Sequence, residues 1–413
     1  MEKRKTPRIR FKGFSDDWEQ RKLGDIVTRV VRKNENLESK LPLTISAQFG
    51  LIAQDEFFDK RIASKNISHY YLIRKGEFAY NKSTSMDAPW GAIKRLEHYD
   101  NGVLSTLYIM FRILDENKVN SDYIVSYYVT NLWHKGVREV AAEGARNHGL
   151  LNIAPVDFFE TTLTIPSNEN EQKNIGEYFR RLDRLITLHQ RKLEKLKIIK
   201  KSMLENCFPK NGEKVPQIRF SGFTNDWEQR KLGEVVGITS GFMGDSLLSD
   251  GKYHLTRIET IADGIVDENR VGYLNEKPDD MYLLKHGDIL YSNINSISHM
   301  GKVAKYQGNS PLYHGINLLR LQLENNINSD FLLYLLNTEK CRNWAKTRAN
   351  QAVSQASINQ SLLTTQEIAI SSFEEQKKIG DYFRNLDHLI TLHQSKLEKL
   401  QKIKKALLER MFV

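Results

Sequence analysis

The sequence has few cysteines and no long apolar run. Only Cys207 and Cys341 occur, and two isolated thiols are too few for a disulfide framework or a zinc cluster. No stretch approaches about eighteen uninterrupted apolar residues, so we expect no membrane-spanning helix. Residues 1–14 are basic and lack the apolar core of a secretory signal. These absences predict a cytoplasmic protein that does not act at a membrane.

The familiar catalytic and cofactor-binding motifs are absent as well. The sequence contains neither a Gly-x-x-x-x-Gly-Lys-Ser/Thr phosphate loop nor a Gly-x-Gly-x-x-Gly fingerprint for a dinucleotide. It has no His-Glu-x-x-His or Cys-x-x-Cys metal motif and no Asn-Pro-Pro-aromatic motif of amino-methyltransferases. We therefore expect a chain that is not an enzyme and that holds no metal or cofactor of its own.

The charge balance is basic. The formal net charge of +10 favours a polyanionic partner, although an excess of this size also occurs on ordinary solvated surfaces. At 413 residues the chain is too long for one ordinary core, because single cores stop growing at about 250–300 residues. Two or more globular domains are the expectation.

The chain repeats itself once. Residues 7–24 return at 216–233 and residues 171–208 return at 375–412, whereas the segments between these blocks have diverged. A period of about two hundred residues is far longer than the 20–50 residues of solenoid repeats and indicates a domain duplication. Two copies with the same frame and different middles suggest one task performed on two different targets.

Each repeated C-terminal block predicts one long helix with a coiled-coil seam. Apolar and other seam positions alternate by four and three residues without an intervening proline, as in a heptad pattern. About 35 residues at 1.5 Å each give a rod of about 50 Å. We expect the two helices to pair antiparallel within the chain, with a partner chain or a homodimer as the alternative. The predicted seam residues are Leu182, Ile186, His189, Leu193, Leu196, Leu386, Ile390, His393, Leu397 and Leu400.

Two features of these helices leave alternatives open. His189 and His393 occupy equivalent seam positions, where a buried polar residue that sets the register is favoured over a metal ligand. Basic residues greatly outnumber acidic ones over residues 180–201. This run suits a solvated coiled-coil flank, a phosphate contact or a face for an acidic partner.

The diverged middles predict mixed structure. Strands are expected over residues 76–80, 107–114, 288–291 and 318–323, and helices over residues 122–133 and 330–344. The predicted fold is therefore α+β: two mixed α/β globular domains separated by a long antiparallel coiled coil. The predicted segments are residues 1–168 and 210–372 for the globular domains and residues 169–209 and 373–413 for the helices.

Two polar clusters recur at equivalent places in the two middles, and their chemistry differs between the halves. Asn, Gln, Arg, Lys and Ser are the side chains that bond to base edges and phosphates, although polar loops without such a role are common. The candidate DNA-binding residues are Asn81, Lys82, Ser83, Thr84, Arg146, Asn147 and His148 in the first half and Asn293, Asn295, Ser296, Gln351, Ser354 and Gln355 in the second.

The chain resembles the specificity subunits of type I restriction-modification enzymes over its whole length. The resemblance is carried by Asp-Trp-Glu-Gln-Arg-Lys-Leu-Gly at Asp17 and Asp226, by the strands at Gly76 and Gly287, and by Glu-Gln-Lys-x-Ile at Glu171. The same opening recurs at residue 375, and a polar lead-in at 354–359 precedes the second long helix. The first half departs from this lead-in at residues 146–153.

The resemblance implies a function and partners. Each middle would be a target recognition domain for one half of a bipartite, asymmetric site on double-stranded DNA, and the paired helices would set the unread spacer. They would also dock two modification subunits, which carry S-adenosylmethionine and methylate adenine. Restriction subunits would add ATP- and Mg²⁺-dependent translocation and cleavage. A non-catalytic coiled-coil adaptor for proteins, and a binder of single strands or RNA, are the alternatives.

Overall fold

The structure is a computed structural model that describes residues 6–46, 50–57, 66–86, 88–141, 151–210, 212–244, 248–262, 264–308, 310–351 and 356–413. The chain divides into two units, here called the first unit (residues 1–189 and 396–413) and the second unit (residues 190–395). Each unit therefore combines one globular segment with parts of both long helices.

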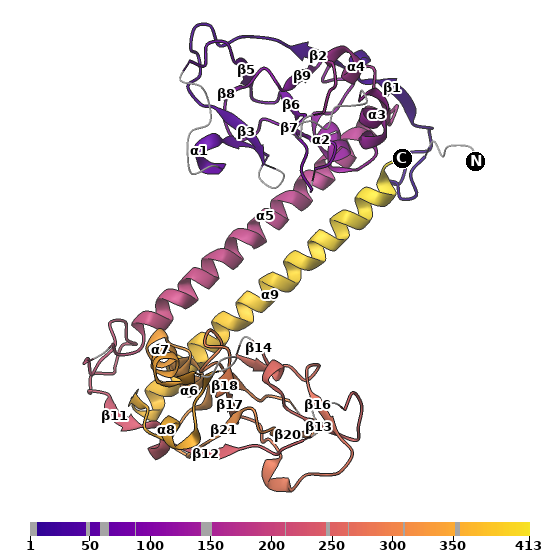
Figure 1. The fold of residues 1–413 in the computed structure, drawn as a ribbon. Coiled ribbons are helices and arrows are strands. Elements are labelled where there is room, and N and C mark those ends of the chain that lie inside the picture. Colours follow the sequence, from indigo (N-terminus) through magenta and orange to yellow (C-terminus); the bar gives the residue numbers. More distant parts are fainter. Residues whose placement is uncertain are drawn as a thin grey trace. The chain divides into compact units, whose positions relative to one another are not determined.

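The two long helices are α5 (Glu169–Asn206) and α9 (Phe373–Met411), shown in Figure 1. They pack antiparallel. In the first unit Asp183 of α5 bonds to Lys404 of α9, and in the second unit Lys200 of α5 bonds to Asp387 of α9 at 2.6 Å. One interface thus uses the same Lys–Asp pair twice with the roles of the helices exchanged, and the expected antiparallel pairing within the chain is confirmed.

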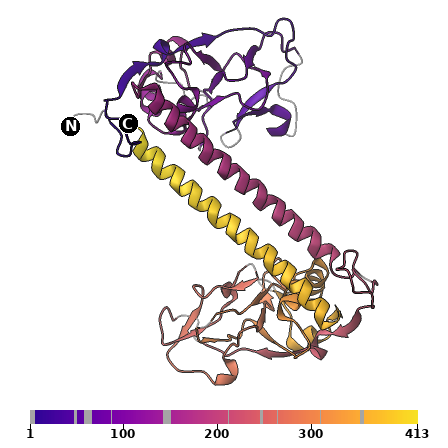
Figure 2. The same ribbon diagram turned by 180° about the vertical axis from the view of Figure 1, so that it is seen from behind.

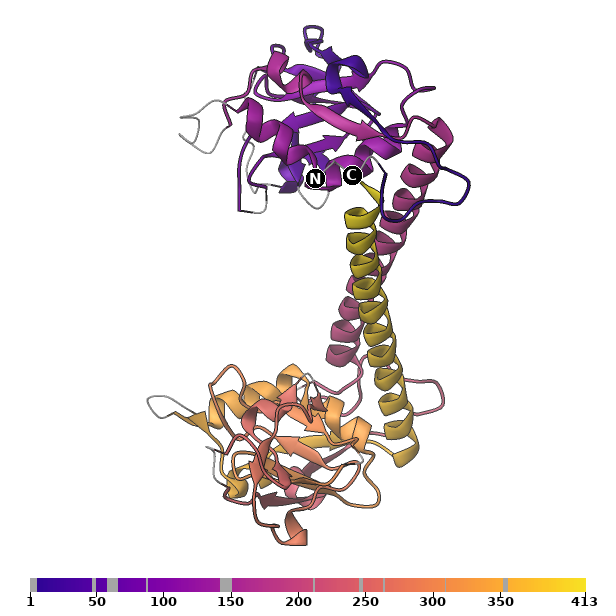
Figure 3. The same cartoon turned by 90° about the vertical axis from the view of Figure 1, so that its right-hand side faces the viewer.

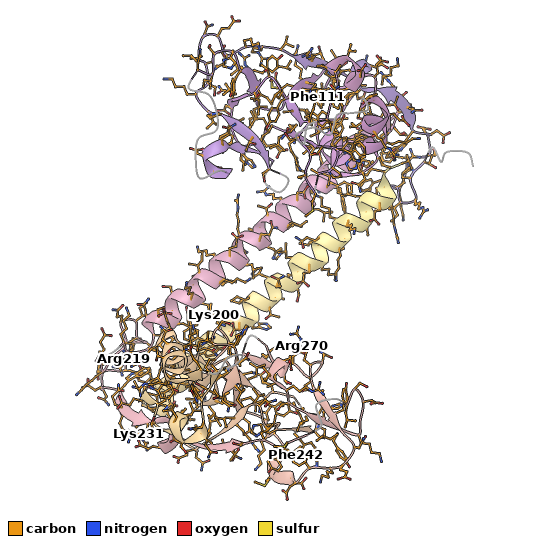
Figure 4. All side chains as sticks on the ribbon, viewed as in Figure 1. Phe111, Lys200, Arg219, Lys231, Phe242 and Arg270 are labelled. Atoms are coloured by element: carbon orange, nitrogen blue, oxygen red, sulfur yellow. The ribbon has the colours of Figure 1, made fainter. Side chains whose placement is uncertain are left out.

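The described residues of the first unit form four small antiparallel sheets, of which the largest has the strand order β2-β9-β6-β7. Helix α2 lies beside this sheet (Figure 1), and the aromatic rings of Phe78 and Phe111 stack within the core at 5.2 Å between centroids. Figure 4 labels Phe111 within this unit. The elements are β1 (Glu19–Lys22), η1 (Leu23–Asp25), β2 (Val27–Val30), β3 (Leu43–Ser46), β4 (Gly50–Ala53), α1 (Gln54–Phe57), β5 (Tyr71–Arg74), β6 (Phe78–Asn81), β7 (Ala92–Arg95), β8 (Asn101–Leu104), β9 (Ile109–Ile113), α2 (Ser121–Val129), α3 (Trp133–Val140), α4 (Pro155–Phe159) and β10 (Thr162–Ile165).

The second unit is built around a sheet with the strand order β12-β21-β17-β19-β15-β14. Helices α6 and α7 follow β21 as α2 and α3 follow β9 in the first unit. The elements are β11 (Glu228–Lys231), η3 (Leu232–Glu234), β12 (Val236–Ser240), β13 (Tyr253–Leu255), η4 (Ile258–Thr260), β14 (Ile261–Ala262), β15 (Ile265–Val266), β16 (Gly272–Leu274), η5 (Asp280–Tyr282), β17 (Ile289–Tyr291), β18 (Ile294–Asn295), β19 (Val303–Lys305), β20 (Leu312–Tyr313), β21 (Leu319–Leu323), α6 (Ser329–Leu336), α7 (Glu339–Arg348), β22 (Asn350–Gln351), β23 (Ala356–Ser357), α8 (Gln360–Thr364) and β24 (Glu367–Ile370).

The expected strands are confirmed, but the first expected helix of the middles ends earlier than predicted and the second is two helices. The segment predicted as one helix from residue 122 to 133 breaks after α2, where Thr130 has extended backbone. The segment from 330 to 344 breaks at Thr338, whose side chain caps α7 by accepting a hydrogen bond from the backbone N–H of Cys341. At the first break the Thr130 hydroxyl donates to the carbonyl of Tyr127 and accepts from the backbone N–H of Leu132, so local side-chain hydrogen bonds accompany both breaks.

The repeated blocks form the same frame in both units. Strand β1 pairs antiparallel with β10, and β11 pairs antiparallel with β24, so each globular segment closes next to the start of its long helix. Arg10 and Glu171 form a two-pronged ion pair at 2.6 and 2.7 Å, and Arg219 and Glu375 repeat it at 2.7 and 2.8 Å. Both glutamates are buried, which makes these hydrogen-bonded pairs demanding in geometry.

Each long helix also receives the capped start of a shorter helix. Gln172 accepts a hydrogen bond from the backbone N–H of Asn120, the cap of α2, and Gln376 does the same for Asn328, the cap of α6. A Cβ atom at Gly176, one turn further along α5, would lie 2.6 Å from the backbone nitrogen of Tyr123. Only glycine permits this close approach, which explains the Ile-Gly pair in the repeated block.

The far end of each helix completes the core of the opposite globular segment. Phe412, just after α9, contacts the rings of Trp18, Tyr123 and Phe179 in the first unit. Phe208, just after α5, contacts Trp227, Phe331 and Phe383 in the second unit. Figures 2 and 3 show the end of α9 beside the first turns of α5 in the first unit. The cores are therefore built from segments that are far apart in sequence.

A buried histidine makes the second unit sensitive to acid. His314 is 1% exposed, and its Nε2 lies 2.8 Å from the carbonyl oxygen of Leu318. Burial, with a smaller contribution from the charge of Arg320, lowers the pKa of His314 to about 4 although the bond to Leu318 opposes the shift. The folded state therefore holds a neutral imidazole well below the pKa of about 6.5 of an unfolded histidine.

We expect His314 to remove about 2–3 kcal/mol of the free energy of unfolding between pH 7 and pH 4.5. Above pH 6.5 both states are neutral at this residue, and below it the unfolded state takes up a proton that the folded state excludes until about pH 4. In a His314→Gln variant this pH-dependent loss of the free energy of unfolding should be absent. Denaturant titrations of both proteins at the two pH values measure it, and equal pH dependence would contradict a buried neutral imidazole.

Candidate nucleic-acid interface

The first polar loop of the first unit follows β6. Lys82 is half-buried, and its Nζ donates to the carbonyl oxygen of Ile153 at 3.3 Å while the backbone N–H of Leu151 donates to the carbonyl of Lys82 at 3.0 Å. Burial lowers the pKa of Lys82. The side chain of Asn81 accepts from the backbone N–H of Ser83 at 3.0 Å, and Ser83 itself is exposed. Thr84 is half-buried.

The first polar loop of the second unit has the same arrangement with different chemistry. The backbone N–H of Ile358 donates to the carbonyl of Asn293 at 2.8 Å, and the Asn293 side-chain amide donates to the carbonyl of Ile358 at 3.2 Å. Asn293 is 7% exposed, and its two hydrogen bonds with Ile358 hold the two segments together beneath the exposed surface. Lys82 and Asn293 are therefore structurally equivalent. Each joins the loop after its strand, β6 or β17, to the segment that follows the second polar cluster.

A small sheet joins the two polar clusters of the second unit. Strand β23 pairs antiparallel with β18 on one side and with β22 on the other, in the order β18-β23-β22. Gln351 and Asn350 in β22 are exposed, and Asn295 at the end of β18 is half-buried. The Asn295 side chain donates to Ser292 and accepts from the backbone of Ser296. Two loops separated by more than fifty residues thus form one polar surface.

Some predicted residues lie outside the described part of the chain. Arg146, Asn147 and His148 fall in residues 142–150, and Ser354 and Gln355 fall in residues 352–355. They stay candidates for DNA contact.

The sequence prediction missed part of the polar surface in the second unit. The exposed hydroxyl of Ser296 lies 2.8 Å from Nδ1 of His299 and 3.1 Å from the hydroxyl of Ser298. Arg342 of α7 donates to the carbonyl of Ser298 at 3.3 Å, and burial lowers the pKa of this guanidinium. The tightly spaced serines at 292, 296 and 298 were a usable signal. The approach of Arg342, from a helix 44 residues further on, was not readable from spacing.

All ten predicted seam residues are buried or half-buried. Leu182, Leu193, Leu386 and Leu397 are buried. The other seam positions, namely Ile186, His189, Leu196, Ile390, His393 and Leu400, are half-buried. In the described part of the chain no group of three His, Cys, Asp or Glu side chains gathers as a metal site would require.

The outward faces of the long helices carry both charge and apolar surface. Arg184, Arg191, Lys192, Lys195, Lys197 and Lys201 of α5 are exposed and form no ion pair among the described residues. Leu185 and Leu188 of α5 are also exposed, as are their repeats Leu389 and Leu392 of α9. Exposed leucines at repeated positions, flanked by basic residues, are typical of a protein-docking surface.

Comparison with known proteins finds relatives of this chain. Residues 224–402 match the family model of the type I restriction modification DNA specificity domain. The type I restriction enzyme MjaVIII specificity subunit of Methanocaldococcus jannaschii is 24% identical over 412 residues, covering 95% of this chain and 91% of that protein. The chain is related to type I restriction specificity subunits. The resemblance inferred from the repeated blocks is thereby confirmed.

Two further comparisons agree with this relationship. The MjaX specificity subunit of the same organism is 40% identical over 193 residues, which are 45% of this chain and 45% of that protein. The crystal structure of the type I restriction-modification system S subunit from M. genitalium covers 99% of both chains with a TM-score of 0.56 and 16% identity. The predicted fold, two mixed α/β domains with a coiled coil of two long helices, is confirmed. In the described residues no helix has the length and apolarity needed to cross a membrane.

Proposed function

We propose that this chain is the sequence-specific, double-stranded DNA-binding subunit of a type I restriction-modification complex and that it has no catalytic role itself. Each globular segment would recognise one half of a bipartite, asymmetric site. S-adenosylmethionine, Mg²⁺ and ATP would bind to partner subunits, because the chain lacks every familiar motif for them. Its relatives are named specificity subunits, which supports this assignment.

One observation carries the proposal: the two units share a frame and differ in the loops that the frame presents. The ion pair of Arg10 with Glu171 and the glutamine clamp of Asn120 recur almost unchanged in the second unit. At the equivalent loop position, by contrast, the first unit has Lys82 and the second has Asn293. The loops that these two residues support differ in their exposed side chains, which include Ser83 in the first unit and Ser296 and Gln351 in the second, so the two frames would present different surfaces to DNA.

The paired helices would serve as the spacer and as the docking surface for two modification subunits. Helix α5 has 38 residues and α9 has 39, so each is about 57 Å long at 1.5 Å per residue. This length is more than one DNA turn of about 34 Å. The exposed leucines and basic side chains on the outward faces suit amphipathic, acidic segments of partner subunits. Restriction subunits would join the complex through the modification subunits.

A protein-binding adaptor remains the second candidate, favoured by the same exposed leucines. The two functions differ in their dependence on salt. Specific duplex binding releases counterions from phosphates, so the logarithm of the association constant should fall linearly with the logarithm of salt concentration. An adaptor would give no saturable, salt-dependent duplex binding.

Lengthening the helix pair should lengthen the unread part of the DNA site. Because Lys200 faces Asp387, Leu196 faces Thr391, so seven residues inserted after each of these positions preserve the seam on both helices. Seven residues add about 10 Å, which corresponds to about three base pairs of DNA. Mapping methylated sites made by the complex with its modification subunits should reveal intact half-sites and a longer spacer. An unchanged spacer would refute the proposed role of the helices.

A further inference from the structure

The first unit contains an open cavity that is much larger than the cavity of about 40 Å³ that Leu204, Phe208, Thr338 and Lys340 help to line at the equivalent place in the second unit. The cavity has a volume of about 700 Å³ and lies between the α2–α3 corner and the two long helices. Its lining includes Val129, Leu132, Asp183, Ile186, Lys404 and Phe412. Val129 and Leu132 are 40% and 41% exposed, so part of the wall is apolar surface in contact with solvent.

In the second unit a tyrosine of the chain itself lies against the equivalent Lys–Asp pair. Tyr334 of α6 donates its hydroxyl proton to Oδ2 of Asp387 at 2.7 Å. Its ring lies 4.9 Å from the ring of Phe383, and Nζ of Lys200, which is labelled in Figure 4, lies 5.5 Å from the ring centroid. Tyr334 is 5% exposed. A phenol thus fills the space between the α6–α7 corner and the Lys–Asp pair of the helices.

The repeat shows which residue stands at this position in the first unit. Asn120 and Asn328 are the equivalent caps of α2 and α6, and the sixth residue after them is Ser126 in one case and Tyr334 in the other. The Ser126 hydroxyl donates to the carbonyl of Asp122 at 2.9 Å instead of reaching the long helices. Asp183 and Lys404, the equivalents of Asp387 and Lys200, line the cavity.

The polar groups of the cavity are ready for a hydroxyl donor. Asp387 bonds both to Lys200 and to the tyrosine hydroxyl, whereas among the described residues Asp183 bonds only to Lys404. A further cation, Lys94 of β7, lies near both groups. Burial and the charge of Lys404 lower the pKa of Lys94, and Asp183 opposes this shift. Carboxylate and ammonium groups together suit a phenol, which both donates and accepts.

The rim indicates that the occupant belongs to a protein. Val129 and Leu132 correspond to Asn337 and Lys340 in the second unit, so the rim is apolar only beside the open cavity. A cavity of about 700 Å³ also exceeds the volume of a single phenol ring, which leaves room for neighbouring apolar groups. An apolar rim around a pocket for one aromatic side chain is the usual form of a strong protein–protein contact.

We propose that the first unit binds a tyrosine side chain of a partner polypeptide in this cavity, in the way that the second unit holds Tyr334. The inference rests on the proposed function only for the identity of the partner, a modification subunit. Two identical modification subunits would then dock differently, because one inserts a tyrosine and the other meets a place that is already filled. This difference would orient the complex on an asymmetric site.

The first experiment uses p-cresol, the side-chain analogue of tyrosine, and the full chain. Calorimetric titration should give one saturable site per chain, and toluene, which lacks the hydroxyl, should bind on the order of tenfold more weakly. Ser126→Tyr should abolish the site by filling it from within. Leu132→Lys, which copies the second unit at an exposed position, should weaken it without disturbing the fold. No saturable binding, or undiminished binding to both variants, would overturn the proposal.

The second experiment titrates the purified modification subunit against the full chain and against both variants. The chain should bind two subunits, and each variant should weaken one of the two sites on the order of tenfold while the other is unchanged. If p-cresol binds and the variants bind both subunits normally, the tyrosine contact is wrong. If the chain binds no modification subunit at all, the proposed function fails, and the p-cresol result still decides the cavity on its own.

Discussion

Replacing Phe412 by alanine should destabilise the first unit by about 3–5 kcal/mol and leave the second unit unchanged, although residue 412 follows the whole second unit in the chain. The ring of Phe412 is 5% exposed and lies among Trp18, Tyr123 and Phe179. Removing it loses the transfer free energy of a large aromatic side chain and leaves a cavity at the centre of an aromatic cluster.

The converse variant supplies the matched control. Phe208→Ala should destabilise the second unit by a similar amount, because Phe208 contacts Trp227, Phe331 and Phe383 there. Leu188→Ala, on the exposed face of α5, should change either unit by less than about 0.5 kcal/mol. Hydrogen exchange of peptides from each unit separates the effects. If the Phe412→Ala variant lost protection from hydrogen exchange in the second unit, the conclusion that Phe412 belongs to the core of the first unit would be contradicted.

Replacing Asp330 by alanine should cost the second unit about 3–5 kcal/mol, because it leaves a buried ammonium without a counter-charge. Asp330 bonds to Lys305 of β19 and accepts from Arg384 of α9 at 2.8 Å. The side chains of Lys305 and Asp330 are only 6% and 8% exposed. This network ties the central sheet and α6 to the long helix.

The first unit provides a milder version of the same network. Asp122 pairs with Arg95 at 2.7 Å, but Arg95 also pairs with Glu97 at 2.8 Å and would keep that partner. Asp122→Ala should therefore cost less than Asp330→Ala. In the second unit, Lys305→Met combined with Asp330→Leu removes both charges and should recover most of the loss. Urea titrations followed by hydrogen exchange measure all three variants, and a double variant as unstable as Asp330→Ala would contradict the explanation.

The domain duplication and the two long helices were predictable because the sequence shows them as regular patterns. The repeated blocks gave the duplication, and the four-three spacing from Leu182 gave the helix and its seam. The loops at Lys82 and Asn293 were predicted as equivalent positions, and the structure confirms that both join the same two segments of their units. Their contact with DNA stays a prediction.

Features decided by tertiary contacts or local caps could not be predicted. The break before α7 falls at Thr338, whose side chain caps α7. Arg342 joins the polar surface only because α7 packs beside the loop of Ser298. The open cavity lies beside a helix in which Ser126 stands at the position of Tyr334, and the two equivalent helices share only the Ser-Asp pair at their start. The effect of such a difference cannot be predicted until the contacts of these residues with the long helices are known.

The most direct test exchanges one globular segment and maps the methylated sites. A chain in which residues 28–165 are replaced by the same segment of a relative with a different target would be assembled with its modification subunits, and methylated adenines would be located by sequencing. The proposal predicts that one half of the bipartite site changes while the other half and the spacer stay the same. A change in both halves, or in neither, would contradict the claim that each unit recognises its own half-site.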